Sequence, residues 1–350
     1  MLKYFAKRIL MMIPVLLGVS LVIFTAMYFT PGDPARMALG EQASEEQIAA
    51  WREVRDLDKP FLEQYGKYML NVITKGDLGI SYKTGKSVTK TILERFPTTF
   101  WLAVATSVIA IALGVLLGIL AANHQNKWID NLLRVLGMVG VSMPIFWMGL
   151  LLIQEFAVKH RWFPVSGWYG PKYMVLPAVT MGLTFTASLM RTTRASVLDC
   201  IKQDYVITAR AKGQREQVIT WHHIFRNALI PIITAAGSTF GIALSGAVIT
   251  EQIFSIPGLG SLMVQAISTR DYPVIRGSVL LLAVSFSVVN LVMDLLYSLA
   301  DPRIRARFAG KSGAGGKSSE KTETAGGETK PAAGELPAEA GEKEEAGHGK

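Results

Sequence analysis

Long stretches of mostly apolar residues alternate with charged segments along this chain. Six of these stretches approach the length of about 20 residues that a helix needs to cross a bilayer. Because lipid cannot hydrogen-bond to exposed backbone groups, such stretches form helices. The pattern therefore predicts an all-α membrane protein with six transmembrane helices, within residues 9–29, 100–122, 136–158, 174–190, 228–249 and 279–300.

The first apolar stretch is predicted to remain as a membrane anchor over residues 1–30. A cleaved signal peptide is the alternative for an apolar stretch near the N-terminus. This one is long, ends in the bulky residues Tyr28 and Phe29, and lacks the small residues of a cleavage site. We therefore expect a retained transmembrane helix.

The segment at 31–97 is too long for a simple turn and mixes basic and acidic residues around scattered apolar ones. Its apolar positions recur at every third residue, at Ile48, Trp51, Val54 and Leu57. This spacing favours an amphipathic helix packed on the membrane domain or on a partner. Glycines indicate turns farther on, at Gly76, Gly79 and Gly85. We expect a small extracytoplasmic subdomain here.

Residues 98–300 contain the other five predicted helices and form the core of the membrane domain. One charged loop in this core, at 195–227, has recurring valines and isoleucines that predict short amphipathic helices, separated at Gly213. Beyond Phe308 the chain has no aromatic residues. Residues 309–350 therefore cannot bury enough apolar surface to fold, and we expect a disordered cytoplasmic tail.

Lysine and arginine are distributed unequally over the short segments beside the spans. Fifteen lie on the side of the N-terminus and five on the opposite side. The positive-inside rule therefore predicts that both termini are cytoplasmic. The net charge of +9 is spread over these segments and forms no basic face with aromatic stacking residues. This favours contact with membrane lipid and argues against nucleic acid as a partner.

The sequence contains no complete nucleotide-binding or catalytic motif. Gly-Lys-Ser occurs three times, but the first glycine that a phosphate-binding loop requires is replaced, by Ile80, Arg305 and Lys311. Adjacent His222 and His223 point in different directions on a helix and lack the further ligands of a metal motif. We therefore expect a non-catalytic chain with no cofactor or metal of its own.

Two ionisable residues lie within the predicted spans. Glu155 is near the outer end of the third and Asp294 near the inner end of the sixth, where each can pair with a flanking lysine or arginine. An ion-coupled secondary carrier would instead place carboxylates at the membrane midplane. That function is a remote alternative, as is a membrane scaffold with no transport path.

The most informative motif lies in the loop at 195–227. It reads Asp-Tyr-Val-Ile-Thr-Ala-Arg-Ala-Lys-Gly at 204–213 and Arg-Asn-Ala-Leu-Ile-Pro at 226–231. These segments resemble the coupling loop of ABC-importer permeases in the variant of the dipeptide and oligopeptide transport family. In the general family pattern of Glu-Ala-Ala, three residues and Gly, only Ala209 and Gly213 match strictly. Further segments resemble the same family, at 30–35, 76–79, 94–99, 142–147, 254–260, 270–273 and 301–305.

The resemblance implies a type I ABC importer permease in a bacterial or archaeal plasma membrane, the first of two permease subunits. It also implies a second, similar permease, two cytoplasmic ATPase subunits that hold ATP and Mg²⁺, and an extracytoplasmic substrate-binding protein. Short peptides are the expected substrate. Glutathione, oligosaccharides, nickel and other small solutes stay open, because selectivity belongs mostly to the binding protein.

The resemblance assigns the loop to coupling, so that closure of the ATPase dimer moves the spans as rigid bodies. From the residues alone, small Ala209 and Gly213, four positions apart, favour close approach to a partner groove. An amphipathic loop lying on anionic lipid fits the residues equally well. The expected coupling residues are Asp204, Tyr205, Thr208, Ala209, Arg210, Ala211, Lys212, Gly213, Arg226 and Asn227.

Two further sets of residues are candidates by position. Pro144 and Pro177 lie inside predicted spans and are candidate helix bends on the translocation path, although packing explains them equally well. The outer segment after the fifth span is a candidate gate or contact for the binding protein, with Glu251, Pro257, Gly258 and Gly260 as its residues.

Overall fold

The computed structural model describes residues 2–40 and 42–300 of the chain. Within them the regular structure is helical, apart from one isolated bridge between Ile80 and Ser87. This confirms the all-α prediction for the described part of the chain. The predicted tail at 309–350 lies outside these residues.

Five helices of the described region are long and apolar enough to cross a membrane by themselves. They are α1 (Leu2–Tyr28), α5 (Val88–Asn123), α8 (Pro171–Ile201), α11 (Arg226–Ile253) and α13 (Tyr272–Ala300). They correspond to the first, second, fourth, fifth and sixth predicted spans. The fourth, predicted to be the shortest, has 31 residues and continues as one helix through Pro177.

The third predicted span is broken. α6 (Trp128–Ser142) is followed by α7 (Ile145–Leu152), which a π-helical turn extends to Lys159, and the two parts are bent by 103°. Pro144 explains the break, because it lacks an N–H and forces Met143 into an extended conformation. The third predicted span is therefore a bent helix pair, which is a sixth span only if its two parts cross the membrane together. The bend lies at Pro144, where the sequence allowed one, and a place for Pro144 on the translocation path stays a prediction.

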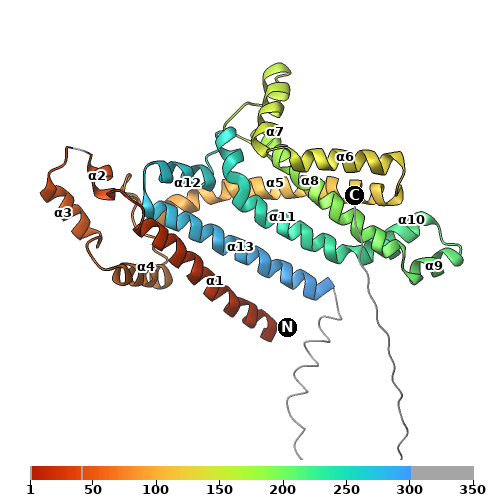
Figure 1. Cartoon of the computed structure of the whole chain (residues 1–350), viewed down its shortest axis with the longest axis horizontal. Helices are drawn as coiled ribbons and strands as arrows, with labels where there is room; N and C mark the ends of the chain where they lie inside the picture. The colour runs from red at the N-terminus through yellow and green to blue at the C-terminus, as the bar shows by residue number, and fades with distance from the viewer. Residues whose placement is uncertain (1, 41, 301–350) are drawn as a thin grey trace, which may run out of the picture. The chain divides into compact units, whose positions relative to one another are not determined.

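α5, α8 and α11 form the centre of the bundle, and α1 lies along α13 beside it (Figure 1). Glycines let α5 and α8 approach closely. A Cβ on Gly118 would lie 2.5 Å from the Thr193 Cβ, and a Cβ on Gly182 would lie 2.8 Å from the Ile109 Cγ2. Small residues at helix contacts suit a membrane, where close packing rather than the hydrophobic effect holds helices together.

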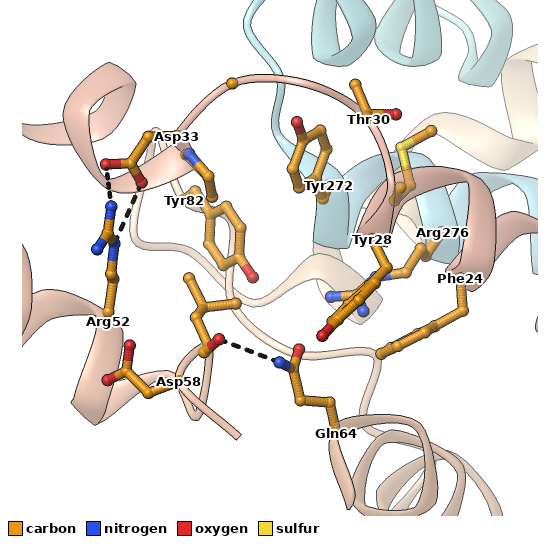
Figure 2. Close-up of a pocket in the computed structure, with 14 residues that line it drawn as sticks. Phe24, Tyr28, Thr30, Asp33, Arg52, Asp58, Gln64, Tyr82, Tyr272 and Arg276 are labelled. Carbon is orange, nitrogen blue, oxygen red and sulfur yellow. Dashed lines mark hydrogen bonds and ion pairs between the residues drawn. The ribbon is translucent and has the colours of Figure 1, made fainter. Parts of the chain in front are cut away.

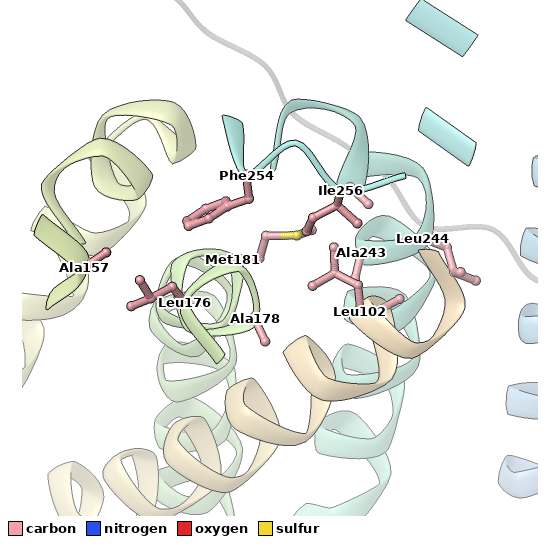
Figure 3. Close-up of a cluster of buried hydrophobic side chains, with 11 residues drawn as sticks. Leu102, Ala157, Leu176, Ala178, Met181, Ala243, Leu244, Phe254 and Ile256 are labelled. Carbon is pink, nitrogen blue, oxygen red and sulfur yellow. The ribbon is translucent and has the colours of Figure 1, made fainter. Parts of the chain in front are cut away.

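One buried cluster joins these three helices near the loop that follows α11. Leu102 of α5, Leu176 and Met181 of α8, and Leu244 of α11 belong to this cluster together with Phe254, which follows the end of α11 (Figure 3). Phe254 is only 2% exposed. The cluster fixes the position of the segment that leads into α12 (Leu259–Ser268).

Short helices lie at both ends of the bundle (Figure 1). At one end, Asp33 caps α2 (Pro34–Leu39), a Ser44–Gln47 capping box starts α3 (Glu45–Val54), and α4 (Phe61–Lys75) follows. At the other end are α9 (Asp204–Ala211) and α10 (Glu216–Val218).

The predicted amphipathic helix at 48–57 is confirmed only in part. Ile48 is buried in α3, but Val54 is 78% exposed and α3 ends before Leu57. The predicted turns are present, since the predicted turn glycines all have positive φ, at Gly76, Gly79 and Gly85.

Arg270 and Asp271, which come just before α13, attach the segment that contains α2, α3 and α4 to the bundle. The buried Asp271 carboxylate accepts hydrogen bonds from the Ser81 hydroxyl and, at 3.0 Å, from the Tyr82 N–H. The Arg270 guanidinium donates to the Pro31 carbonyl. Segments nearly 240 residues apart in sequence therefore meet at this end of the molecule.

Candidate coupling surface and outer helix junction

The predicted coupling segment consists of one short helix and a glycine turn. Asp204 occupies the first turn of α9, where a negative charge is favourable, and its carbonyl accepts a hydrogen bond of 2.9 Å from the Thr208 hydroxyl. The helix ends at Ala211, and Gly213, which follows the C-cap Lys212, has φ +74° and donates its N–H to the Arg210 carbonyl. α10 begins three residues later, so the predicted break at Gly213 is confirmed.

The inner face of α9 packs on the membrane domain. Val206 and Ala209 are buried in one cluster with residues of α5, α8, the π-helical turn after α10, and α11. These partners are Ile119, Ala122, Val197, Leu198, Ile219, Ile224, Ala228 and Ile232. A displacement of α9 would therefore reach three transmembrane helices through this shared cluster and the π-helical turn, because a close-packed interior transmits strain.

The opposite face of α9 and the turn after it are exposed. We call this the coupling surface, and it comprises Asp204, Tyr205, Ile207, Thr208, Arg210, Ala211, Lys212 and Gly213. Ile207 is 59% exposed and Tyr205 38%. Partial burial raises the pKa of Tyr205 to about 12, with the adjacent Cys200 thiol as a second cause, so its hydroxyl remains protonated. The surface thus combines apolar, hydroxyl and cationic groups.

Internal contacts hold the coupling surface in shape. The Arg210 guanidinium donates to both Glu216 carboxylate oxygens, at 2.8 and 3.3 Å, and so bridges the turn from α9 to α10. The His223 Nε2 lies 2.8 Å from the Gln214 Oε1, and the Asn227 amide donates to the His223 carbonyl at 2.7 Å. Arg226 and Asn227 are exposed at the start of α11.

The structure corrects one explanation drawn from the sequence. Because Ala209 and Gly213 are small and four positions apart, the sequence predicts that both allow close approach to a partner groove. Ala209 instead faces the chain's own core, and Gly213 has a left-handed conformation that ends the helix. Exposed Ile207, which spacing alone did not select, lies on the outer face. Its sequence neighbours, apolar Val206 and polar Thr208, did not show which face of the helix it occupies.

An ion pair that the sequence did not predict lies behind the coupling surface. Arg194 of α8 donates twice to the Asp130 carboxylate of α6, from Nε and from a terminal nitrogen, both at 2.7 Å. Asp130 is fully buried and also accepts the Asn126 N–H at 2.9 Å. The pair fixes α6 to α8 near the end of the bundle that contains α9.

The residues predicted as an outer gate or as a contact for the binding protein lie in a packed helix junction. The fully buried Glu251 carboxylate accepts a hydrogen bond of 2.6 Å from the Thr99 hydroxyl and one of 2.8 Å from the Ser261 N–H. Thr99 in turn accepts the Leu259 N–H at 2.8 Å. Glu251 therefore joins α5, α11 and the start of α12.

The two glycines of this set fit around the Glu251 carboxylate. A Cβ on Gly258 would lie 2.2 Å from the Glu251 Oε1, and one on Gly260 would lie 2.7 Å from the Val248 backbone. Gly258 and Gly260 are buried, whereas Pro257 is exposed. Pro257 is thus the residue of the predicted set whose side chain a partner could contact in this conformation.

We expect Gly258→Ala to destabilise this junction by about 1–3 kcal/mol, because the new methyl group displaces the Glu251 carboxylate from its partners. Apparent Tm in detergent should fall by several degrees. Gly246→Ala is the matched control, since a Cβ on Gly246 of α11 has no atom within 4 Å. Equal Tm values for the two variants would contradict this packing.

The two ionisable residues predicted within spans both have partners. The Glu155 carboxylate lies 2.8 Å from the Lys159 Nζ, and Asp294 lies 2.7 Å from an Arg8 guanidinium nitrogen. This confirms the expected pairing with flanking cations. In the described part of the chain, no three His, Cys, Asp or Glu side chains are grouped closely enough to hold a metal ion.

Comparison with known families covers nearly the whole described region. The family described as binding-protein-dependent transport system inner membrane component matches residues 114–306, and the family of its N-terminal part matches residues 1–103. The glutathione transport system permease protein GsiC of Pectobacterium atrosepticum is 42% identical over 305 residues, which cover 87% of this chain and 99% of that relative. GsiC of Escherichia coli strain K12 is 40% identical over the same coverage.

Two solved structures share the fold. Both are inward-facing forms of the MetNI methionine ABC transporter, and each covers 61% of this chain and 97% of its own. Their TM-scores are 0.53 at 13% identity and 0.50 at 15% identity, so they support the fold alone. From the family matches and the close relatives, the chain belongs to the binding-protein-dependent transport system inner membrane component family, as a multi-pass permease subunit of an ABC importer of the peptide and oligopeptide group in the bacterial plasma membrane.

Proposed function

We propose that this chain forms half of the translocation path of an importer for short peptides, including glutathione, which an extracytoplasmic binding protein delivers. The relatives named for glutathione transport support this substrate class, because glutathione is itself a tripeptide. ATP binding and hydrolysis belong to two partner ATPase subunits in this proposal. The end of the bundle that contains α9 is then cytoplasmic, in line with the excess of lysine and arginine there.

The observation that carries the proposal is the position of α9. Its outer face is exposed, and its inner face is buried in one cluster with residues of α5, α8 and α11. An ATPase that moves the coupling surface would thus shift these helices together, as rigid-body alternating access requires. An amphipathic segment that merely rested on lipid would instead present its apolar face to the membrane.

A groove along the bundle is a candidate wall of the translocation path. It has a volume of about 850 Å³ and is lined by α5, α11 and α13, with Val108, Phe240 and Val292 among its residues. The groove is open on one side. A second, similar permease would close it, which supports the proposal that one chain provides half of a path.

The substrate class is tested by uptake in the native host. Deletion of the gene for this chain should abolish saturable uptake of radiolabelled glutathione or of short peptides, and a plasmid copy should restore it. Oligosaccharide and nickel uptake serve as parallel measurements in the same strains. Normal peptide and glutathione uptake in the deletion strain, with loss of either other solute, would refute the proposed substrate.

A further inference from the structure

A polar cavity lies at the outer ends of α1 and α13, where α2 and α3 face them (Figure 2). Its volume of about 420 Å³ is within the range of small-molecule sites. Two segments that resemble the transport family meet at its wall, at 30–35 and 270–273. The coupling surface and the groove described above do not include it.

One wall of the cavity carries a cation held between aromatic rings. The Arg276 guanidinium lies 4.7 Å from the centre of the Phe24 ring and 5.0 Å from that of Tyr68. Its Nε is buried and has no hydrogen-bond partner among the residues that the structure describes. Arg276 also forms no ion pair with a described carboxylate. A half-buried guanidinium with a buried Nε and no anion is costly, so this wall favours an anionic ligand.

Hydroxyl groups add donors beside this cation. Figure 2 shows the Arg276 guanidinium and the hydroxyls of Tyr28 and Tyr82 turned toward the middle of the cavity. Tyr272 lines the same cavity, is only 8% exposed, and has a buried hydroxyl with no partner among the described residues. Burial raises the pKa of Tyr82, so its hydroxyl remains a donor. The guanidinium fork with nearby hydroxyls matches a carboxylate.

The opposite wall has acidic groups. Asp33 is ionised, because hydrogen bonds from Arg52 and the Ala35 N–H outweigh the effect of partial burial and lower its pKa. Its carboxylate is shared by Arg52 at 2.6 Å and Arg36 at 3.7 Å. Asp58 lines the cavity beside them, is exposed, and takes part in no ion pair of the described region. This wall can therefore accept an ammonium group.

We propose that this cavity binds a small zwitterionic peptide, with the carboxylate on Arg276 and the ammonium group beside Asp58. The inference rests on the proposed function, since it names where an imported peptide first contacts this subunit. The aromatic side chains Phe24, Tyr28 and Tyr82 pack against the peptide between its two charged ends. A short peptide with both termini free would therefore match the charges of both walls.

The test uses the assembled transporter in nanodiscs without the binding protein, and radiolabelled trialanine as the probe in equilibrium dialysis. Trialanine should bind, whereas its C-terminal amide and its N-acetyl derivative should bind much more weakly. Arg276→Gln should weaken binding of trialanine about tenfold or more, but leave binding of the amide unchanged. Asp58→Asn should weaken trialanine and leave the N-acetyl derivative unchanged.

Two further variants keep the test independent of folding. Tyr82→Phe retains the ring and removes one donor, so trialanine binding should still fall by a few fold while the complex stays intact. Lys75→Gln removes an exposed positive charge on α4 outside the cavity and should have no effect. Copurification of each variant with its partner subunits shows that it is folded.

Several outcomes would overturn the inference. One is equal trialanine affinity in the wild-type complex and in Arg276→Gln. Another is a phospholipid that native mass spectrometry finds on the wild type but not on Arg276→Gln, with no trialanine bound. A wild-type complex that imports peptides yet does not bind millimolar trialanine would refute this site and leave the proposed function intact. Loss of the proposed function would instead appear as absent peptide uptake in the host.

Discussion

Gly213→Trp is expected to reduce transport strongly without preventing membrane insertion. A Cβ on Gly213 has no atom within 4 Å, so the indole would project into open space on the coupling surface and obstruct an ATPase. The positive φ adds a strain of about 1–2 kcal/mol, which the fold can tolerate. We expect peptide uptake to fall by about tenfold or more, a loss of about 1.4 kcal/mol or more in productive docking.

Gly213→Asn separates obstruction from backbone strain. Asparagine adopts the left-handed conformation more readily than other non-glycine residues and has a small side chain. This variant should keep most of the uptake, with a membrane level equal to that of Gly213→Trp. If both variants transported normally, Gly213 would have no role in docking. If both were absent from the membrane, the turn would be a folding element first.

The second large effect is expected at the ion pair between α6 and α8. Asp130→Ala removes the partner of a largely buried guanidinium and leaves the Arg194 charge uncompensated. Loss of one member of a buried pair costs about 3–5 kcal/mol. We expect strongly reduced membrane levels of a fluorescent fusion of this variant, and a much lower apparent Tm in detergent.

The double variant Asp130→Ala with Arg194→Met tests the cause. It removes the unpaired charge and keeps an apolar side chain of similar length, so it should recover part of the lost stability. Arg134→Gln is the matched control, because Arg134 is half exposed and lies 3.7 Å from the Asp130 carboxylate. A double variant no more stable than Asp130→Ala would show that the charge on Arg194 is not the cause.

Hydropathy predicted the order of the spans and located the five long apolar helices, because the length needed to cross lipid is a strong constraint. It failed at Met143 and Pro144, where the apolar run continues although the backbone turns by 103°. It also placed the start of α5 at Phe100, twelve residues after its actual start at Val88. The first three turns of α5 contain more polar residues, so they do not belong to the apolar stretch that hydropathy detects.

The candidate site was predicted in position but not in detail. Sequence spacing located the break at Gly213, since glycine is favoured where φ is positive. It could not show which face of α9 is buried, because Val206, Ile207 and Ala209 are all small or apolar and only the tertiary contacts of α5 and α11 decide between them. The Glu251 junction was found by position but interpreted as a surface, because its partner Thr99 lies 152 residues away.

Cysteine crosslinking tests most directly whether the coupling surface docks an ATPase. In a Cys200→Ser background, Lys212→Cys places a thiol on the coupling surface, and Lys75→Cys places one on α4, a helix at the opposite end of the bundle (Figure 1). Within the assembled transporter, Lys212→Cys should crosslink to a Walker-motif ATPase subunit, to an extent that changes with bound ATP, whereas Lys75→Cys should not. Crosslinking of the ATPase through Lys75→Cys, or through neither position in an intact complex, would contradict the account.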